Sequence, residues 1–451
     1  MPSGAKSLRA VSGSRFVLSR VAQAVSRGVA VGALCLVVAA PTMAVSVPAK
    51  DTNLKSATAY MVSYRHQEHM WQTADGGLHL VTNRGATRSG GTLSLYSSFD
   101  GGLNWTSQIV LSKSGPTSVS DGYFDTATSS LSLVYDTSDG NINFVTYPYD
   151  PGTRTFGVGP KVQTLPKTAG ISGVNPTFVT DTLGNTWVAM VKVVDTSQEA
   201  VIGLYRRKVG TTKWVDTGLT FGDKDAKSAP KIKRSARLVL TPSGIGMIYT
   251  VHGDMTWASR PTKGDATVPW QLGLMYSSPY PEDDEPASSH FSVVADGKGY
   301  LHLAFTDNGG LWYQRFDASK QVWELSQNLV PVAAGKNVTY MQMSWLGNKN
   351  VALTANFGEM ARVYQSADRG GTTSSGSTSF ACTYLLQHVK TADTGGQYNF
   401  GFPRLEAPSI ALSSPVTVLQ QYEDYTSGTS VLERLKSYQF SLATASDTCS
   451  Q

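Results

Sequence analysis

A short phrase that recurs along the chain constrains its fold more than any other feature. Residues 74–81 read Ala-Asp-Gly-Gly-Leu-His-Leu-Val, and residues 295–304 repeat both the Ala-Asp-Gly start and the Leu-His-Leu run. A weaker copy lies at residues 181–188. In each copy Asp and Gly separate two apolar runs, a pattern that predicts two strands joined by a tight turn.

A second strand pair is predicted downstream of each phrase, and its last strand opens on tryptophan. Trp105, Trp214 and Trp323 hold this place, and Trp270 holds a similar place in an intervening unit. Units of four strands that recur along a chain are typical of a β-propeller, in which each unit forms one blade. The low share of charged residues, 16%, suits such an all-β chain of short strands.

Candidate innermost strands set the number of blades. They lie at residues 70–74, 123–127, 177–180, 236–240, 291–295, 340–345 and 409–412. The sequence therefore predicts an all-β fold of seven blades, each of four antiparallel strands, in one domain over residues 45–445 with a tail at 446–451. Six blades are the alternative, because the last unit is irregular and residues 60–64 could form a strand that closes the ring.

One hairpin carries a recognisable signature. Ser98, Asp100, Gly102 and Trp105 give the spacing Ser-x-Asp-x-Gly-x-Asn-Trp, in which Asp accepts turn N–H groups, Gly tolerates positive φ and Trp packs beneath the turn. This spacing resembles the Asp-box, or BNR repeat, of the sialidase superfamily. The resemblance implies a hairpin between the third and fourth strands of a propeller blade, with a structural role.

A degenerate copy of the box follows later in the chain. Ser366, Asp368 and Gly370 keep the spacing, while Thr373 replaces the tryptophan. We expect the same structural role for this copy.

Residues 1–44 have the pattern of a secretory signal peptide. Lys6, Arg9, Arg15, Arg20 and Arg27 precede an apolar run at residues 29–40 that is too short to span a membrane comfortably. Small residues ending at 44 predict cleavage there, and therefore a secreted or periplasmic protein that is not held in a membrane.

The net charge of +5 is due to this leader alone, because five of the 38 basic residues and none of the 33 acidic residues lie in it. The remainder is balanced, so charge gives no reason to expect nucleic-acid binding. Cys382 and Cys449 remain after cleavage and could form a disulfide in an oxidising compartment, or could stay as two free thiols.

Functional groups of a propeller gather where the innermost strands begin, around one mouth of the central channel. Candidate substrate-binding residues at these positions are Arg65, His66, Tyr123, Arg234, Arg237 and Arg404. Candidate catalytic residues are His69, His252, His290 and Tyr340. Guanidinium groups bind carboxylates, and His and Tyr can move protons at a sugar carbon. The alternative is that these residues are polar only because a channel mouth is wet.

The remaining histidines have a simpler interpretation. His79 and His302 occupy equivalent places in the repeated phrase, which predicts a packing role in a strand.

The phrase Ser-His-Phe at residues 289–291, followed by residues 296–303, is similar to sequences of propeller polysaccharide lyases such as ulvan lyases. That resemblance implies seven blades and β-elimination, in which Arg neutralises a uronate carboxylate and His or Tyr transfers the protons. We therefore expect an acidic polysaccharide as the partner of a monomeric enzyme.

Two alternatives stay open. The Asp-box resemblance also permits a sialidase-type hydrolase, although the Phe-Arg-Ile-Pro motif of that family is missing and its nearest echo is residues 402–406. A propeller that binds a glycan or a protein without catalysis is the other alternative.

No cofactor or metal is predicted from the spacing of His and carboxylates. The acidic run at residues 282–285 could hold calcium, but it has the pattern of a solvated loop.

Overall fold

The computed structural model describes most of the chain after residue 44. The described residues are 45–57, 61–62, 66–87, 90–114, 119–157, 161–197, 199–222, 235–251, 253–262, 269–278, 290–307, 309–330, 338–357, 360–371, 379–387, 398–399, 404–425 and 432–442. Two compact units are distinguished, Met1–Ala40 and Pro41–Gln451. Residues 1–44, which include the whole of the first unit, lie outside the described residues.

The described strands of the second unit form seven sheets. The first sheet contains β3 (Met70–Gln72), β4 (Leu78–Thr87), β5 (Gly90–Ser98) and β6 (Thr106–Ser114). The second contains β7 (Ser120–Asp125), β8 (Ser130–Asp136), β9 (Ile142–Asp150), β10 (Thr155–Phe156) and β11 (Gln163–Thr164). The third contains β12 (Ile171–Thr180), β13 (Thr186–Val194), β14 (Ala200–Arg207) and β15 (Trp214–Phe221).

The fourth sheet contains β16 (Ser235–Thr241), β17 (Gly244–Val251), β18 (Asp254–Pro261) and β19 (Gln271–Ser277). The fifth contains β20 (Phe291–Ala295), β21 (Tyr300–Asp307), β22 (Gly310–Asp317), β23 (Val322–Trp323) and β24 (Gln327–Val330). The sixth contains β25 (Val338–Gly347), β26 (Asn350–Phe357), β27 (Met360–Ser366), β28 (Ala381–Gln387) and β1 (Val45–Pro48). The seventh contains β29 (Tyr398–Asn399), β30 (Leu405–Glu406), β31 (Val416–Asp424), β32 (Leu432–Phe440) and β2 (Lys50–Ser56).

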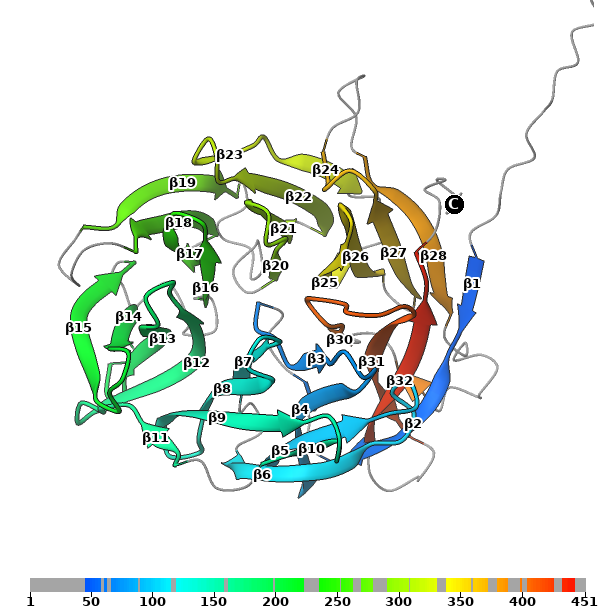
Figure 1. Cartoon of the computed structure of the whole chain (residues 1–451), viewed down its shortest axis with the longest axis horizontal. Helices are drawn as coiled ribbons and strands as arrows, with labels where there is room; N and C mark the ends of the chain where they lie inside the picture. Colours follow the sequence, from blue (N-terminus) through cyan, green and yellow to red (C-terminus); the bar gives the residue numbers. More distant parts are fainter. Residues whose placement is uncertain are drawn as a thin grey trace, which may run out of the picture. The chain divides into compact units, whose positions relative to one another are not determined.

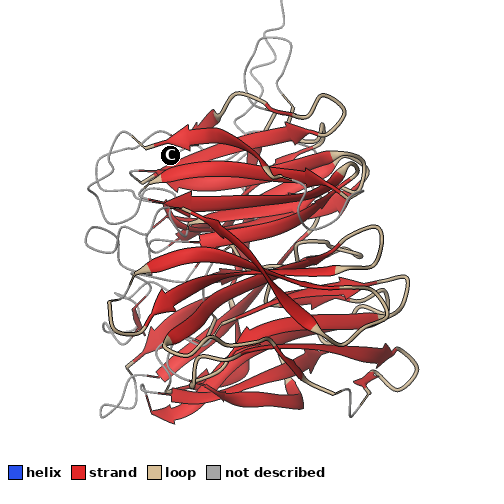
Figure 2. Cartoon of the chain, turned by 90° about the vertical axis from the view of Figure 1, so that its left-hand side faces the viewer, coloured by secondary structure: helices blue, strands red, loops and turns tan. Residues whose placement is uncertain are grey.

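These sheets form a β-propeller, as the sequence predicts. Figure 1 shows β3, β7, β12, β16, β20, β25 and β30 around a common axis, with the later strands of each sheet lying progressively farther out. Strands, turns and loops make up the described residues, which contain no helix (Figure 2). None of the described residues therefore forms a helix long and apolar enough to cross a membrane.

The recurring phrases form the turn between the first and second strands of a sheet. In the first copy Thr73 N donates to Gly77 O at 2.9 Å, and in the last Asp296 N donates to Tyr300 O at 3.0 Å. His79 and His302 follow these turns and are both buried. Burial lowers the pKa of His79 to about 4, so its ring is a neutral packing group. The predicted packing role of both histidines is confirmed.

The hairpin that resembles an Asp-box connects β5 to β6, the third and fourth strands of the first sheet, as the resemblance implies. Asp100 Oδ1 accepts from the backbone N–H groups of Leu103 and Asn104 at 3.1 and 2.9 Å. Trp105 is buried and donates through Nε1 to Gly102 O at 2.9 Å. Gly102 has a φ of 84°, a conformation that favours glycine.

The degenerate box connects β27 to β28, again the third and fourth strands of a sheet. Ser366 Oγ accepts from the N–H groups of Asp368 and Gly370 at 3.2 and 3.0 Å. A Cβ at Gly370 would lie 2.0 Å from the Tyr313 hydroxyl, so the hairpin packs closely against the fifth sheet.

The ring is closed by the first strands of the described chain. β2 pairs antiparallel with β32 and supplies the outer strand of the last sheet. β1 pairs in parallel with β28 on the outer edge of the sixth sheet. Residues 61 and 62 form a bend, and the other residues of the segment 60–64 lie outside the described residues. The closing strand therefore comes earlier than the alternative prediction places it.

The last innermost strand differs from the prediction. β30 lies at Leu405–Glu406, whereas residues 409–412 leave the seventh sheet. Trp345 N donates to Ser409 O at 2.7 Å, and Ala411 N donates to Trp345 O at 3.0 Å, so this segment is held by the sixth sheet. Pro408 and Pro415 flank it and lack the N–H groups that a ladder with β31 would need.

Closure should contribute measurably to stability. Leu54 on β2 is 1% exposed and packs with Trp105, Leu419 and Leu435, between the first and last sheets. Leu54→Ala should lower the free energy of unfolding by about 2–5 kcal/mol, because it removes buried methyl groups and leaves a cavity. Urea denaturation would measure the loss. The neighbouring exposed Lys55 provides the control, since Lys55→Ala should change stability by less than about 0.5 kcal/mol; equal effects would contradict a packed closure.

Candidate functional site

The structure divides the predicted functional residues into two groups. His66, His69, His290, Tyr340 and Arg404 lie where the innermost strands begin, which we call the strand-start face. Together with Glu406 they form what we call the strand-start cluster. Tyr123 and Arg237 line a cavity instead.

His290, Tyr340 and Arg404 are in direct contact. The His290 and Tyr340 rings stack with centroids 6.0 Å apart and planes 26° apart. The Arg404 guanidinium carbon lies 5.7 Å from the centroid of the Tyr340 ring. The three side chains come from the start of β20, from β25 and from the start of β30, so three consecutive sheets meet here.

A second contact extends the cluster to the first sheet. His69 Nδ1 lies 2.8 Å from Glu406 Oε1, and Arg404 acts electrostatically on the same carboxyl group. His66 stacks on Phe291, the neighbour of His290, with ring centroids 5.4 Å apart. The cluster therefore continues from the fifth sheet to the first.

Most of the cluster is shielded from solvent. His66, His69, His290, Tyr340 and Glu406 are each 6% exposed or less, whereas Arg404 is half-buried. Burial raises the pKa of Glu406, although His69 and Arg404 act against this rise. The site thus combines a carboxyl group inclined to hold a proton, a guanidinium group nearer the solvent and a stacked His–Tyr pair.

Glu406 belongs to the strand-start cluster but is not among the functional residues predicted from the sequence. It lies in a two-residue strand beside buried Leu405, and its partner His69 is 337 positions away. A charged residue within an otherwise buried strand was the available signal.

Arg237 takes part in an ion-pair network through both of its terminal nitrogens. Its guanidinium pairs with Asp121, and its Nη2 lies 2.9 Å from Glu68 Oε1. Asp121 also accepts from Glu68 N at 2.9 Å and from Thr177 Oγ1 at 2.8 Å. Burial raises the pKa of Glu68, since Arg237 only partly offsets the cost of removing this carboxylate from water.

An axial cavity of about 800 Å³ begins at this network. It follows the second halves of β7, β12, β16 and β20 toward their hairpins, on what we call the hairpin face. The sequence placed Tyr123 at the start of a strand, but β7 begins at Ser120, so Tyr123 lies three residues into it and lines this cavity. The prediction that places Tyr123 at the start of a strand is therefore wrong.

Several predicted residues lie outside the described residues. These are Arg65, Arg234, His252, Cys449 and the acidic run at 282–285. Cys382 takes part in a disulfide bond, and the other two cysteines of the chain, Cys35 and Cys449, both lie outside the described part. The pairing of Cys382 with Cys449 therefore stays a prediction. Within the described ranges, no group of three or more His, Cys, Asp or Glu side chains is placed to hold a metal ion.

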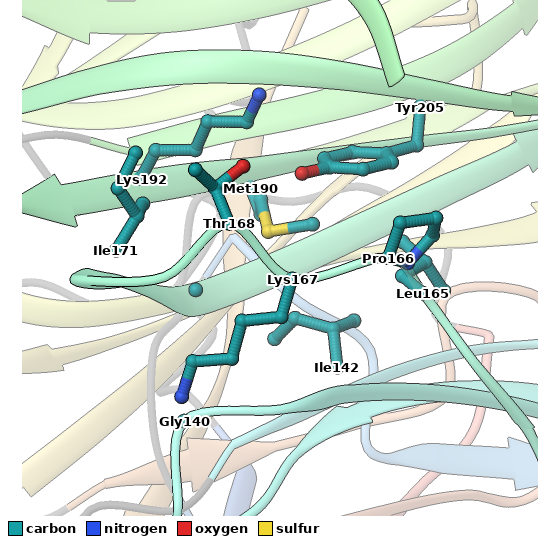
Figure 3. A pocket seen from close by; sticks show the side chains of 11 residues that line it. Gly140, Ile142, Leu165, Pro166, Lys167, Thr168, Ile171, Met190, Lys192 and Tyr205 are labelled. Atoms are coloured by element: carbon teal, nitrogen blue, oxygen red, sulfur yellow. The ribbon is translucent and has the colours of Figure 1, made fainter. Parts of the chain in front are cut away.

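A small pocket between the second and third sheets is a poorer candidate for a site. Figure 3 shows Lys167, Met190, Lys192 and Tyr205 around it. The pocket holds about 20 Å³, room for about one water molecule. Lys192 Nζ pairs with Asp216 Oδ2 at 2.6 Å, which explains its place here without a ligand.

Asp136, at the end of β8, is a buried carboxyl group with one strong partner. Val119 N donates to Asp136 Oδ1 at 2.9 Å. Burial raises the pKa of Asp136 from 3.8 to about 7, and this hydrogen bond only partly opposes the rise. Its protonation state therefore changes near neutral pH.

Comparisons with known proteins concern the fold. No protein-family model and no curated protein matches the chain. Similar solved structures include the Aleuria aurantia lectin, described as a six-bladed β-propeller (11% identity, TM-score 0.43, covering 77% of this chain and 98% of the lectin). They also include a Penicillium chrysogenum α-L-arabinanase (10% identity, TM-score 0.41, 88% of this chain and 99% of that one). The Streptococcus pneumoniae NanB sialidase is another (12% identity, TM-score 0.42, 87% and 70%).

The stability of the protein should depend on pH through Asp136. Its folded pKa lies above its unfolded value of 3.8, so the folded state binds more protons between about pH 4 and 7. Stability should fall as pH rises through this window, by up to about 4 kcal/mol for the full shift, and Asp136→Asn should remove this fall.

Urea denaturation of the two proteins at pH 4, 5.5 and 7.5 would measure the difference. Asp139→Asn is the matched control, because Asp139 is an exposed residue of the same sheet's next turn and should not remove the fall. Parallel pH profiles for wild type and Asp136→Asn would contradict the assignment.

Proposed function

We propose that this protein acts on a glycan and that the strand-start cluster cleaves an acidic, uronate-containing polysaccharide by β-elimination. The observation that supports this most is the contact of His290, Tyr340 and Arg404, three groups of complementary chemistry brought together from separate sheets. Elimination needs a cation for the carboxylate and two groups that can exchange protons.

Each of the three residues has a role in the proposal. Arg404, the most exposed, binds the uronate carboxylate and stabilises the charge that develops when the neighbouring C5–H bond breaks. Of the stacked pair Tyr340 and His290, one takes the C5 proton and the other gives a proton to the leaving oxygen at C4. The C4–O bond breaks, a C4=C5 double bond forms, and no water is consumed.

Glu406 supports a second candidate, hydrolysis of a glycosidic bond in the manner of a sialidase-type enzyme. A hydrolase needs a carboxyl group that holds its proton for the leaving oxygen, and burial raises the pKa of Glu406 beside Arg404. Glycan binding without catalysis is the remaining candidate. In that case the protein would bind the polysaccharide but show neither lyase nor hydrolase activity.

The same proposal covers where the protein works. Residues 1–44 act as a cleaved signal, and the mature chain, a monomeric propeller over residues 45–445 with a tail at 446–451, works in the periplasm or outside the cell. The disulfide at Cys382 supports an oxidising compartment.

Removing one hydroxyl should separate catalysis from folding. Tyr340→Phe keeps the ring that stacks on His290 but removes the hydroxyl that takes or gives a proton, so kcat on uronate polysaccharides should fall by about 10²- to 10⁴-fold. Absorbance of the unsaturated product across a panel of such polysaccharides would measure the rate. Tyr384→Phe, on the outer strand β28, is the matched control and should keep full activity.

The complementary measurement tests hydrolysis. If elimination is the reaction, a fluorogenic sialoside should not be cleaved. Every new reducing end should then be matched by a gain in the absorbance of the unsaturated product. Hydrolysis that is lost in Glu406→Gln would replace the lyase assignment. If the Tyr340→Phe and His290→Ala variants both fold and both keep full activity, these two residues are not the catalytic ones.

A further inference from the structure

The axial cavity of about 800 Å³ is a space that the proposed reaction does not use. It extends toward the hairpins that follow the innermost strands; Arg237 and Glu68 line it, whereas no residue of the strand-start cluster does. On β16 it is lined from Arg237 to Pro242, and on β12 from Phe178 to Thr182, so it spans the half of these strands that leads into their hairpins. Its volume of about 800 Å³ is that of a typical small-molecule site.

The walls of the cavity are apolar. β16 contributes Leu238 and Leu240, and β20 contributes Val293. Leu240 and Ile410, which both line the cavity, are 39% and 37% exposed, which is unusual for large aliphatic side chains so near the axis of a propeller. A ligand with an apolar body would cover this surface.

The charged groups of the lining are mainly acidic. The lining contains Glu68 and Asp125 and one cation, Arg237, which already pairs with Asp121 and Glu68; the side chain of Asp296, also in the lining, is fully buried. Asp296 pairs with Arg369 at 3.1 Å. The cavity would therefore repel an anionic sugar, the substrate proposed for the other face, and would attract a cation.

Aromatic rings add to this preference. Tyr123 is 50% exposed on the wall beside Glu68, and Trp345 lines the cavity from the end of β25. Faces of Tyr and Trp rings attract ammonium groups, by about 0.5–2 kcal/mol each. A cation bound beside Glu68 would also stabilise the ionised form of this carboxyl group.

We propose that the axial cavity is a second ligand site, separate from the strand-start cluster, which binds an organic cation with an apolar body, such as an aryl or alkyl ammonium compound. The apolar walls hold the body, while Glu68 and Tyr123 hold the cationic group. This inference does not depend on whether the other face cleaves a glycan.

Three naphthalene probes that differ in charge test the proposal on the intact protein. Isothermal titration calorimetry would compare 2-naphthylmethylammonium, neutral 2-naphthylmethanol and anionic 2-naphthylacetate. The cation should bind about tenfold more tightly than the anion, with the alcohol between them. Equal affinities, tighter binding of the anion, or no binding of any probe would overturn the proposal.

Two leucines of the same sheet locate the binding. Leu240→Lys places a cation at the cavity wall and should weaken binding of the ammonium probe by about tenfold. Leu272→Lys on the outer strand β19, where Leu272 is 60% exposed, is the matched control and should change it by less than about twofold. If both variants lose affinity for the ammonium probe to a similar extent, or if neither variant loses it, the probe binds outside this cavity.

Glu68→Gln provides a test that does not add bulk or charge to the wall. It should narrow the difference in affinity between the ammonium and acetate probes by several-fold, because a negative charge is removed. Tyr340→Phe on the opposite face should leave all three affinities unchanged. An unchanged preference for the cation in Glu68→Gln would remove Glu68 from the site.

Discussion

Closure of the ring by β2 is the constraint on which the rest of the structure depends. β2 pairs with β32 of the last sheet while the Asn53 side chain binds the first sheet. Asn53 Oδ1 accepts from Trp105 N at 2.8 Å, and its Nδ2 donates to Trp105 O at 3.1 Å, as a paired strand residue would. One short segment thereby joins the two ends of the ring.

The strand-start cluster lies across this same junction. His69 belongs to the first sheet and Glu406 to the seventh, and their 2.8 Å contact exists only when the ring is closed. The Asp-box takes part in the closure as well, because Ser437 Oγ on β32 donates to Gly101 O at 2.9 Å. A motif with no catalytic residue thus helps to close the ring across which the candidate site lies.

Much of the fold could be predicted because propeller blades repeat local signals. The Asp-Gly turns before His79 and His302, and the box from Ser98 to Trp105, each depend on residues within a few positions of one another. The closing strand could not be predicted in the same way, since its partner lies hundreds of residues away. The segment at 409–412 was misplaced because its apolar residues fit a strand, while its prolines and its bonds to Trp345 take it to another sheet.

The site was predicted in part for the same reason. His66, His69, His290, Tyr340 and Arg404 were found because the start of each innermost strand could be approximated from the repeat. An error of three residues at Tyr123 was enough to move it from the start of β7 to the wall of the axial cavity. Glu406 was missed because only its tertiary partner distinguishes it from an ordinary strand residue.

The outer rim of the propeller has one further consequence. β1 covers the outer edge of β28, whereas β19 is the outermost described strand of the fourth sheet and exposes Leu272 and Leu274 by 60% and 65%. An extended strand that has exposed leucines and no further described strand beside it is a template for another extended chain. Among the described strands, β19 is therefore one edge at which this protein would self-associate when concentrated, and charged substitutions on β19 would make it easier to keep in solution.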